Sequence, residues 1–153
     1  MTEGTPFKQS RATVVVSTST DALSVVQAAY AEGVHWSLLS DVSTGPESTT
    51  RVDLSQYSDV IDIVSDGPYV TVQSGCTWGQ LEDKLNAHEL TLGPVPVWVY
   101  GHSLAETFLQ GTLERPSPRY GNLANAILSV HMALPWGERL CVRHHRVGPW
   151  GLT

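Results

Sequence analysis

The passage from Val70 to Gly121 constrains the fold of this chain more than any other. It opens with a β-rich run that reaches Gly75, after which Thr77 and Gln80 form the capping-box pattern that starts a helix. An apolar face follows at helical spacing, made of Trp78, Leu81, Leu85 and, less regularly, His88. The first element expected is therefore a strand that turns at a glycine into an amphipathic helix.

The chain before this passage predicts a strand–helix–strand unit. Residues 12–16 are apolar and mostly β-branched, residues 17–20 offer several helix N-caps, and Gly33 is a natural helix end. Apolar side chains recur between them at i, i+3, i+4, i+7 and i+8: Ala22, Val25, Val26, Ala29 and Tyr30. Residues 34–39 read as the second strand, so the unit has the order of a parallel crossover.

The middle of the chain is richer in strands than in helices. Short strands are expected at residues 51–54 and 60–64. The second of these turns through Asp66-Gly67 into a return strand at residues 69–73. Residues 90–99 cannot form a central strand, because two prolines interrupt them.

The last third adds one short helix and one hairpin. The helix is expected at residues 103–110, and the hairpin joins residues 127–134 to 139–143 through the turn at 135–138. The predicted fold class is therefore α+β, with a small strand–helix–strand unit followed by a β-rich subdomain that carries one good amphipathic helix.

Composition excludes several classes of function. Asp and Glu number 15 against 9 Lys and Arg, with no basic run, so we expect no nucleic-acid partner. No apolar run approaches the roughly 20 residues that cross a bilayer, and no signal peptide opens the chain. We therefore expect a cytoplasmic protein of 153 residues without a membrane partner, having a flexible N-terminus (1–11), a domain (12–143) and a tail (144–153).

Six segments resemble, in order, the FAD-binding domain of the FAD-linked oxidases. This is the vanillyl-alcohol oxidase / p-cresol methylhydroxylase (PCMH) superfamily, which includes glycolate and D-lactate dehydrogenases and alkyl-dihydroxyacetonephosphate synthase. The matching segments are the opening unit at 12–39, the Asp-Leu-Ser and isoleucine-rich hairpin at 53–63, Val-Gln-Ser-Gly-Cys-Thr-Trp at 72–78, Leu-Thr-Leu-Gly-Pro-Val-Pro at 90–96, Ser-Pro-Arg-Tyr-Gly at 117–121 and Leu-Pro-Trp-Gly-Glu at 134–138. Together they cover most of residues 12–143.

The resemblance implies a flavoprotein with an FAD-binding type-2 (PCMH-like) domain that holds FAD without a covalent bond. In the family, small residues let backbone N–H groups approach the pyrophosphate. Carried over to this chain, the cofactor contacts are Pro94, Ser103, Leu104, Ala105, Gly111, Ser117, Tyr120 and Gly121. The resemblance assigns no catalytic residue, and no metal site is expected, because the adjacent His144 and His145 would point to opposite faces of a strand.

Two carboxylates depart from the family pattern where the phosphates are expected. Asp41 lies in the loop that carries a glycine run in the family, and Ala105 and Glu106 replace two glycines in the second phosphate segment. A carboxylate about 4 Å from a phosphate charge is repelled by roughly 1–4 kcal/mol in watery to surface-like surroundings.

Two functional hypotheses follow. The first is the FAD-binding domain or subunit of an FAD-linked oxidoreductase that acts on an alcohol or a 2-hydroxy acid. The alternative is a non-catalytic PCMH-like module that has lost flavin binding and serves as an interaction or remnant domain. A third hypothesis is that a partner chain or self-association completes the fold, because exposed apolar strand edges favour pairing.

Single residues keep alternatives of their own. Cys76 is either a reactive thiol at a helix start or a small buried residue. His102 either carries a covalent flavin or is a polar loop residue. Arg119 and Tyr120 either contact the flavin or form a structural turn, and Trp78 is expected in the core.

Overall fold

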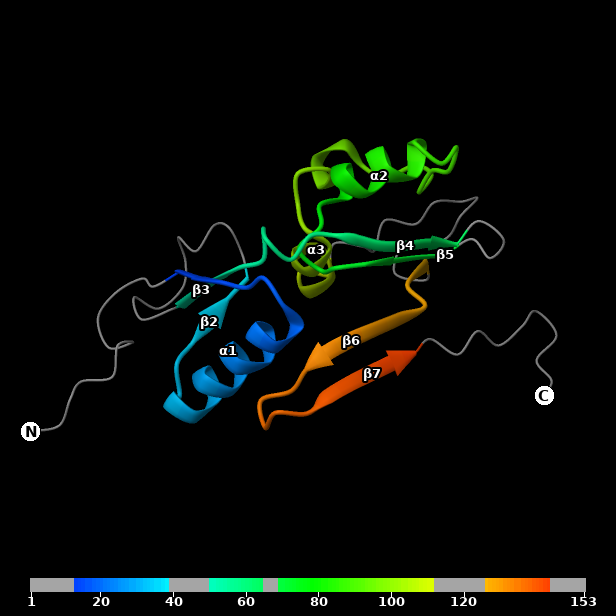
Figure 1. Ribbon diagram of the computed structural model, residues 1–153. Coiled ribbons are helices and arrows are strands. Elements are labelled where there is room, and N and C mark those ends of the chain that lie inside the picture. Colours follow the sequence, from blue (N-terminus) through cyan, green and yellow to red (C-terminus); the bar gives the residue numbers. More distant parts are fainter. Residues whose placement is uncertain (1–12, 39–49, 65–68, 112–125, 144–153) are drawn as a thin grey trace, which may run out of the picture.

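The computed structural model describes residues 13–38, 50–64, 69–111 and 126–143 (Figure 1). The elements, in chain order, are β1 (Thr13–Val15), α1 (Ser19–Glu32), β2 (Trp36–Ser37), β3 (Thr50–Asp53), β4 (Val60–Val64), β5 (Tyr69–Val72), α2 (Trp78–Asn86), the 3-10 turn η1 (Val97–Val99), α3 (Leu104–Leu109), β6 (Ser129–Ala133) and β7 (Arg139–Arg143). The described residues combine a small parallel sheet, two antiparallel hairpins and a few helices, and this mixed content confirms the α+β class.

The N-terminal unit is a three-stranded parallel sheet with α1 beside it (Figure 1). Thr18 caps α1 in a capping box with Asp21, and Gly33 ends the helix in the left-handed conformation at φ 63°. The strand order is β1-β3-β2, so β3 lies between the two strands that the crossover joins. The order of the predicted unit is thus confirmed, but its two strands are not neighbours.

The main core lies between the β4–β5 hairpin and α2, which Figure 1 shows stacked one above the other. Cys76, Leu81 and Leu85 are buried there against apolar side chains of both strands. A second cluster forms around Trp78 and Val99, so the helix face predicted from the sequence is confirmed at its three main positions. His88 is the exception, because it is exposed and follows the end of α2.

The β6–β7 hairpin lies against the N-terminal unit, and its turn touches α1 (Figure 1). Gly137 has φ 94° and closes a three-residue turn, in which the Leu134 N–H donates to the Glu138 carbonyl at 2.8 Å. The Gln27 side chain of α1 occupies the space that a side chain at Gly137 would need. This turn therefore packs the β6–β7 hairpin against α1 of the N-terminal unit.

Two predicted elements differ from the structure. The second strand, expected at 34–39, is reduced to Trp36–Ser37, because β3 runs beside it for only two residue pairs. On the apolar face expected for α1, Ala22, Val25, Val26 and Ala29 are only half-buried and Tyr30 is exposed, and no residue of that helix is fully buried.

No helix in the described part of the chain is long and apolar enough to cross a membrane.

Candidate cofactor site

The site is built on the turn between β5 and α2. Gly75 donates its N–H to the Tyr57 carbonyl at 2.9 Å, and a side chain in its place would collide with the carbonyls of Leu54 and Tyr57. The glycine therefore lets this turn lie directly on the loop that follows β3. Thr77 and Gln80 then close the capping box predicted from the sequence.

The N-termini of α2 and α3 are joined by backbone hydrogen bonds. Thr77 and Ser103 form an isolated antiparallel bridge, and the Trp78 N–H donates to the His102 carbonyl at 3.2 Å. In return, the Leu104 N–H donates to the Cys76 carbonyl at 2.9 Å. The segment that resembles the second phosphate cradle is thereby fixed against the strand-to-helix turn.

The first turn of α3 is closed by its own carboxylate. Ser103 caps the helix, its N–H donates to Glu106 Oε2 at 3.0 Å, and the Glu106 N–H donates to Ser103 Oγ at 3.1 Å. The Leu104 and Ala105 N–H groups donate to the carbonyls of Cys76 and Ser74, both at 2.9 Å. Every backbone donor from Ser103 to Glu106 therefore has an acceptor within the protein.

Glu106 lies where the positive end of α3 favours an anion. Its side chain is 13% exposed, and its Oε2 is 3.7 Å from Nδ1 of His102. The His102 ring stands edge-on to Trp98, with the ring centroids 6.4 Å apart. A carboxylate, a partly exposed imidazole and an indole thus cluster at the start of this helix.

A buried hydrogen bond anchors α3 to α2. The Trp78 indole Nε1–H donates to Thr107 Oγ1 at 2.9 Å, and both side chains are buried. Trp78 is thus a core residue, as the sequence predicted.

The predicted cofactor contacts fall into three groups. Ser103, Leu104 and Ala105 lie together at the start of α3, and Gly111 follows the other end of that helix with φ 64°. Pro94 is exposed on the loop before η1. The remaining predicted contacts and the first-loop carboxylate lie outside the described residues: Ser117, Tyr120, Gly121 and Asp41.

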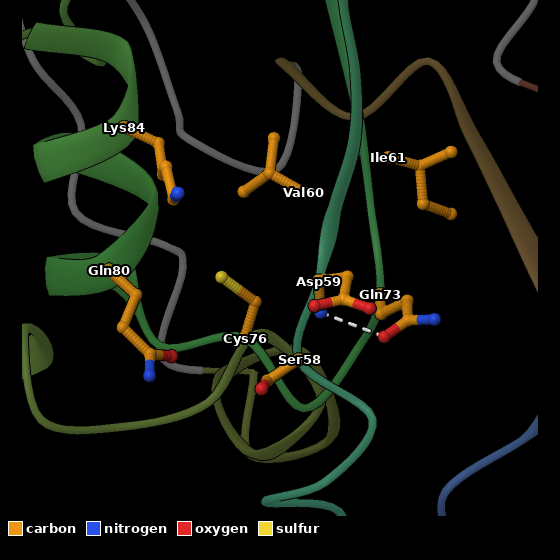
Figure 2. A pocket seen from close by; sticks show the side chains of 8 residues that line it. All are labelled: Ser58, Asp59, Val60, Ile61, Gln73, Cys76, Gln80 and Lys84. Carbon is orange, nitrogen blue, oxygen red and sulfur yellow. Dashed lines mark hydrogen bonds between the residues drawn. The ribbon is translucent and has the colours of Figure 1, made fainter. Parts of the chain in front are cut away.

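A cleft that the sequence did not predict opens between the β4–β5 hairpin and α2 (Figure 2). Its volume is about 510 Å³, and it is lined by Ser58, Asp59, Val60, Ile61, Gln73, Cys76, Gln80 and Lys84. Gln80 and Lys84 lie one helical turn apart and therefore on one face of α2. This spacing was the only sequence feature that could have indicated a polar wall of the cleft. Burial raises the pKa of the Cys76 thiol, and the nearby Asp59 carboxylate raises it further, which supports the interpretation of Cys76 as a buried structural residue.

No group of three or more His, Cys, Asp or Glu side chains within the described ranges could hold a metal ion.

The fold is that of an α+β FAD-binding domain of the FAD-linked oxidase type. A family model described as "FAD binding domain" matches residues 10–142, and the chain belongs to that family. FAD is the cofactor that this membership assigns to it. A comparison with curated protein sequences returns no significant match.

Solved structures support the same fold. Two structures of alkyldihydroxyacetonephosphate synthase match with TM-scores of 0.68 and 0.69 at 19% identity, over 86% and 88% of this chain and 26% and 27% of theirs. A structure of p-cresol methylhydroxylase with substrate bound matches with a TM-score of 0.64 at 16% identity, over 92% of this chain and 29% of that one. The chain thus spans less than a third of the matched structures.

One described segment disagrees with a diphosphate contact. At Ser103–Glu106 the backbone donors are all used internally, and a carboxylate takes the place of an incoming anion. The segment therefore does not fit a pyrophosphate cradle in this conformation.

Proposed function

We propose that the chain is the FAD-binding domain or subunit of an FAD-linked oxidoreductase acting on an alcohol or a 2-hydroxy acid. When bound, FAD would supply two-electron oxidation of the substrate and pass the electrons to oxygen or another acceptor. The observation that carries the proposal is the family match over residues 10–142.

FAD retention tests the cofactor part of the proposal. Purified protein is incubated with FAD, separated by gel filtration and examined for flavin absorbance and quenched flavin fluorescence. We expect flavin to elute with the protein and to be released by acid denaturation, as a non-covalent cofactor is. A colourless protein peak at high FAD concentration would overturn this part.

The substrate class is tested separately, by anaerobic bleaching of the bound flavin. Glycolate, lactate and benzyl alcohol represent 2-hydroxy acids and alcohols. Slow bleaching by any of them supports the proposed class. Retained FAD that none of the three reduces, while dithionite does, contradicts the substrate class and leaves the cofactor assignment standing.

Glu106 favours a second candidate function, a PCMH-like module that has lost flavin binding and acts as an interaction domain. Its carboxylate accepts the Ser103 N–H at 3.0 Å and occupies the N-terminal position of α3. A diphosphate would have to displace this carboxylate and would meet its charge. This arrangement supports weak FAD affinity or none.

Substitution of Glu106 separates the two candidates. Glu106→Gln removes the charge and keeps an oxygen that can accept the Ser103 N–H, whereas Glu32→Gln removes an equal charge from the exposed end of α1. If the carboxylate hinders the diphosphate, Glu106→Gln tightens FAD binding about tenfold, since a unit charge a few ångströms away contributes about 1–4 kcal/mol.

The comparison includes a ligand control and a double variant. Riboflavin, which has no phosphate, should bind the Glu106→Gln and parent proteins equally. The double variant Asp41→Gly/Glu106→Gly should gain still more FAD affinity if both loops face phosphates. Equal FAD affinity of all variants would remove the support for the second candidate.

A further inference from the structure

The outer edge of β7 is an unpaired strand within the described residues. β7 pairs with β6 alone, in a two-stranded antiparallel sheet, and all five of its residues are exposed. Leu140 and Val142 are 42% and 47% exposed. A free strand edge of this kind offers backbone hydrogen bonds to another chain.

The hairpin geometry identifies which backbone groups of β7 point outward. The Leu134–Glu138 hydrogen bond at 2.8 Å closes the turn, and hydrogen-bonded pairs recur at every second residue of an antiparallel ladder. Leu140 and Val142, opposite Met132 and Val130, are therefore the residues bonded to β6. The N–H and C=O groups of Arg139, Cys141 and Arg143 point away from β6, toward the open edge.

Two of the residues whose backbone groups face the open edge are arginines. Arg139 and Arg143 flank Cys141 on one face, where the Cys141 thiol is 3.6 Å from His131 Nε2 of the neighbouring strand. Leu140 and Val142 present the opposite, apolar face. On one face, a strand added along this edge would meet Arg139 and Arg143 with Cys141 between them. On the other face it would meet Leu140 and Val142.

We propose that the β7 edge binds an extended segment of a partner chain, with acidic residues opposite Arg139 and Arg143 and apolar residues opposite Leu140 and Val142. Charge selects this partner over a second copy of the chain. The symmetric antiparallel pairing centred on Cys141 would place Arg139 of one copy opposite Arg143 of the other, and like charges directly opposite are destabilising. Strand addition supplies the affinity through the backbone, and the charges supply the selectivity.

A designed peptide tests the proposal directly. The probe is fluorescent acetyl-Val-Glu-Val-Thr-Val-Glu-Val-amide, whose antiparallel register places a Glu opposite each arginine. Its control is the same peptide with Lys in place of Glu. We expect anisotropy titrations to show binding of the Glu peptide, weakening as salt is raised, and at least about tenfold weaker binding of the Lys peptide.

Two sets of variants locate the binding edge. Arg139→Glu/Arg143→Glu should reverse the preference from the Glu peptide to the Lys peptide. Cys141→Pro removes one outward N–H without touching the bonds to β6 and should abolish binding, whereas Cys141→Ala should bind as the parent does. Hydrogen exchange at β6 shows that the hairpin of each variant is intact.

Three results would overturn the proposal: equal binding of both peptides, undiminished binding by the Cys141→Pro variant with β6 still protected, or a dimer that light scattering detects and the same proline abolishes. The last result would assign the edge to a second copy of the chain. None of the three depends on FAD, so they are independent of the proposed function.

Discussion

The hydrogen bond between Trp78 and Thr107 shows how single residues hold the two helices of the site together. The indole Nε1–H is buried and donates to Thr107 Oγ1 at 2.9 Å. Thr107→Val keeps the shape of the side chain but leaves that donor without its acceptor, so we expect the free energy of unfolding to fall by about 1–3 kcal/mol. Urea denaturation followed by circular dichroism measures the change.

A double-mutant cycle isolates the contribution of that hydrogen bond. In a Trp78→Phe background there is no indole donor, so Thr107→Val should lose most of its destabilising effect. An unchanged penalty in that background would mean that Thr107 acts through the helix backbone, where the carbonyls of Ser103 and Leu104 share its single hydroxyl proton as acceptors.

Asp21 gives a second residue-level prediction, on pH. Hydrogen bonds from Thr18 and Ser17 lower the pKa of this carboxyl below its usual value of 3.8. A lowered pKa in the folded state means that the ionised form stabilises the protein above the unfolded-state value and that this contribution is lost as the pH falls through the folded-state pKa.

We therefore expect Asp21→Asn to lower the melting temperature near neutral pH and to have little effect once the pH lies below the folded-state pKa of Asp21. Thermal scans of the parent and the variant across that range measure the difference. A Ser17→Ala variant, which removes a hydroxyl that donates to Asp21 Oδ2 at 2.9 Å, should show a smaller additional loss on adding Asp21→Asn. A difference in melting temperature between parent and Asp21→Asn that is the same at every pH would contradict the lowered pKa of Asp21.

At the scale of elements, local rules were sufficient to predict most boundaries. The capping box at Thr77, the helix end at Gly33 and the hairpin turn at 135–138 are specified by neighbouring residues, and the structure has each of them. Residues 17–20 offered several N-caps, and the structure selects Thr18 among them. The insertion of β3 between β1 and β2 was not predicted, because pairing partners depend on distant residues.

Alanine substitutions at Gly75 and Gly93 test whether the β5–α2 turn requires close contact with the loop that follows β3. A Cβ atom at Gly75 would lie 2.6 Å from the Tyr57 carbonyl oxygen, and that oxygen belongs to backbone that cannot easily move. Gly93 has φ 81° with nothing nearby, so Gly93→Ala meets only conformational strain of about 1–2 kcal/mol.

Gly75→Ala should therefore destabilise the protein by more than about 3 kcal/mol, well beyond the effect of Gly93→Ala. Denaturant unfolding of both variants compares the two penalties, with near-ultraviolet circular dichroism to show whether Gly75→Ala keeps fixed tertiary packing. Equal penalties would mean that the turn does not depend on close approach to the Leu54–Tyr57 loop.

At the scale of the whole molecule, the family could be predicted from the order of its segments, but the state of the site could not. Replacement of two glycines by Ala105 and Glu106 was visible in the sequence and suggested simple repulsion of phosphate. The Ser-x-x-Glu spacing of Ser103 and Glu106 is itself a local capping-box pattern, and the structure has that box. Only the structure shows that Leu104 and Ala105 donate to the carbonyls of Cys76 and Ser74 in the β5–α2 turn. These two bonds join residues about thirty positions apart, which local patterns such as capping boxes do not specify.

The two parts of the molecule differ in how much core they contain. The β4–β5–α2 part buries two apolar clusters, whereas α1 has no fully buried residue and its sheet buries chiefly Val16 and Val52. Local opening requires less free energy where few apolar contacts are lost. The N-terminal unit should therefore open before the rest, although the turn at Gly137 joins it to the β6–β7 hairpin.

Native-state hydrogen exchange in increasing denaturant measures this order. We expect amides of α1 and β2 to exchange through an opening of lower free energy than amides of α2, β4 and β5. Gln27→Ala, which removes the α1 side chain packed against Gly137, should lower the opening free energy of α1 and leave that of α2 unchanged. A single opening free energy shared by α1 and α2 would show that the small N-terminal contacts are enough to make the fold one cooperative unit.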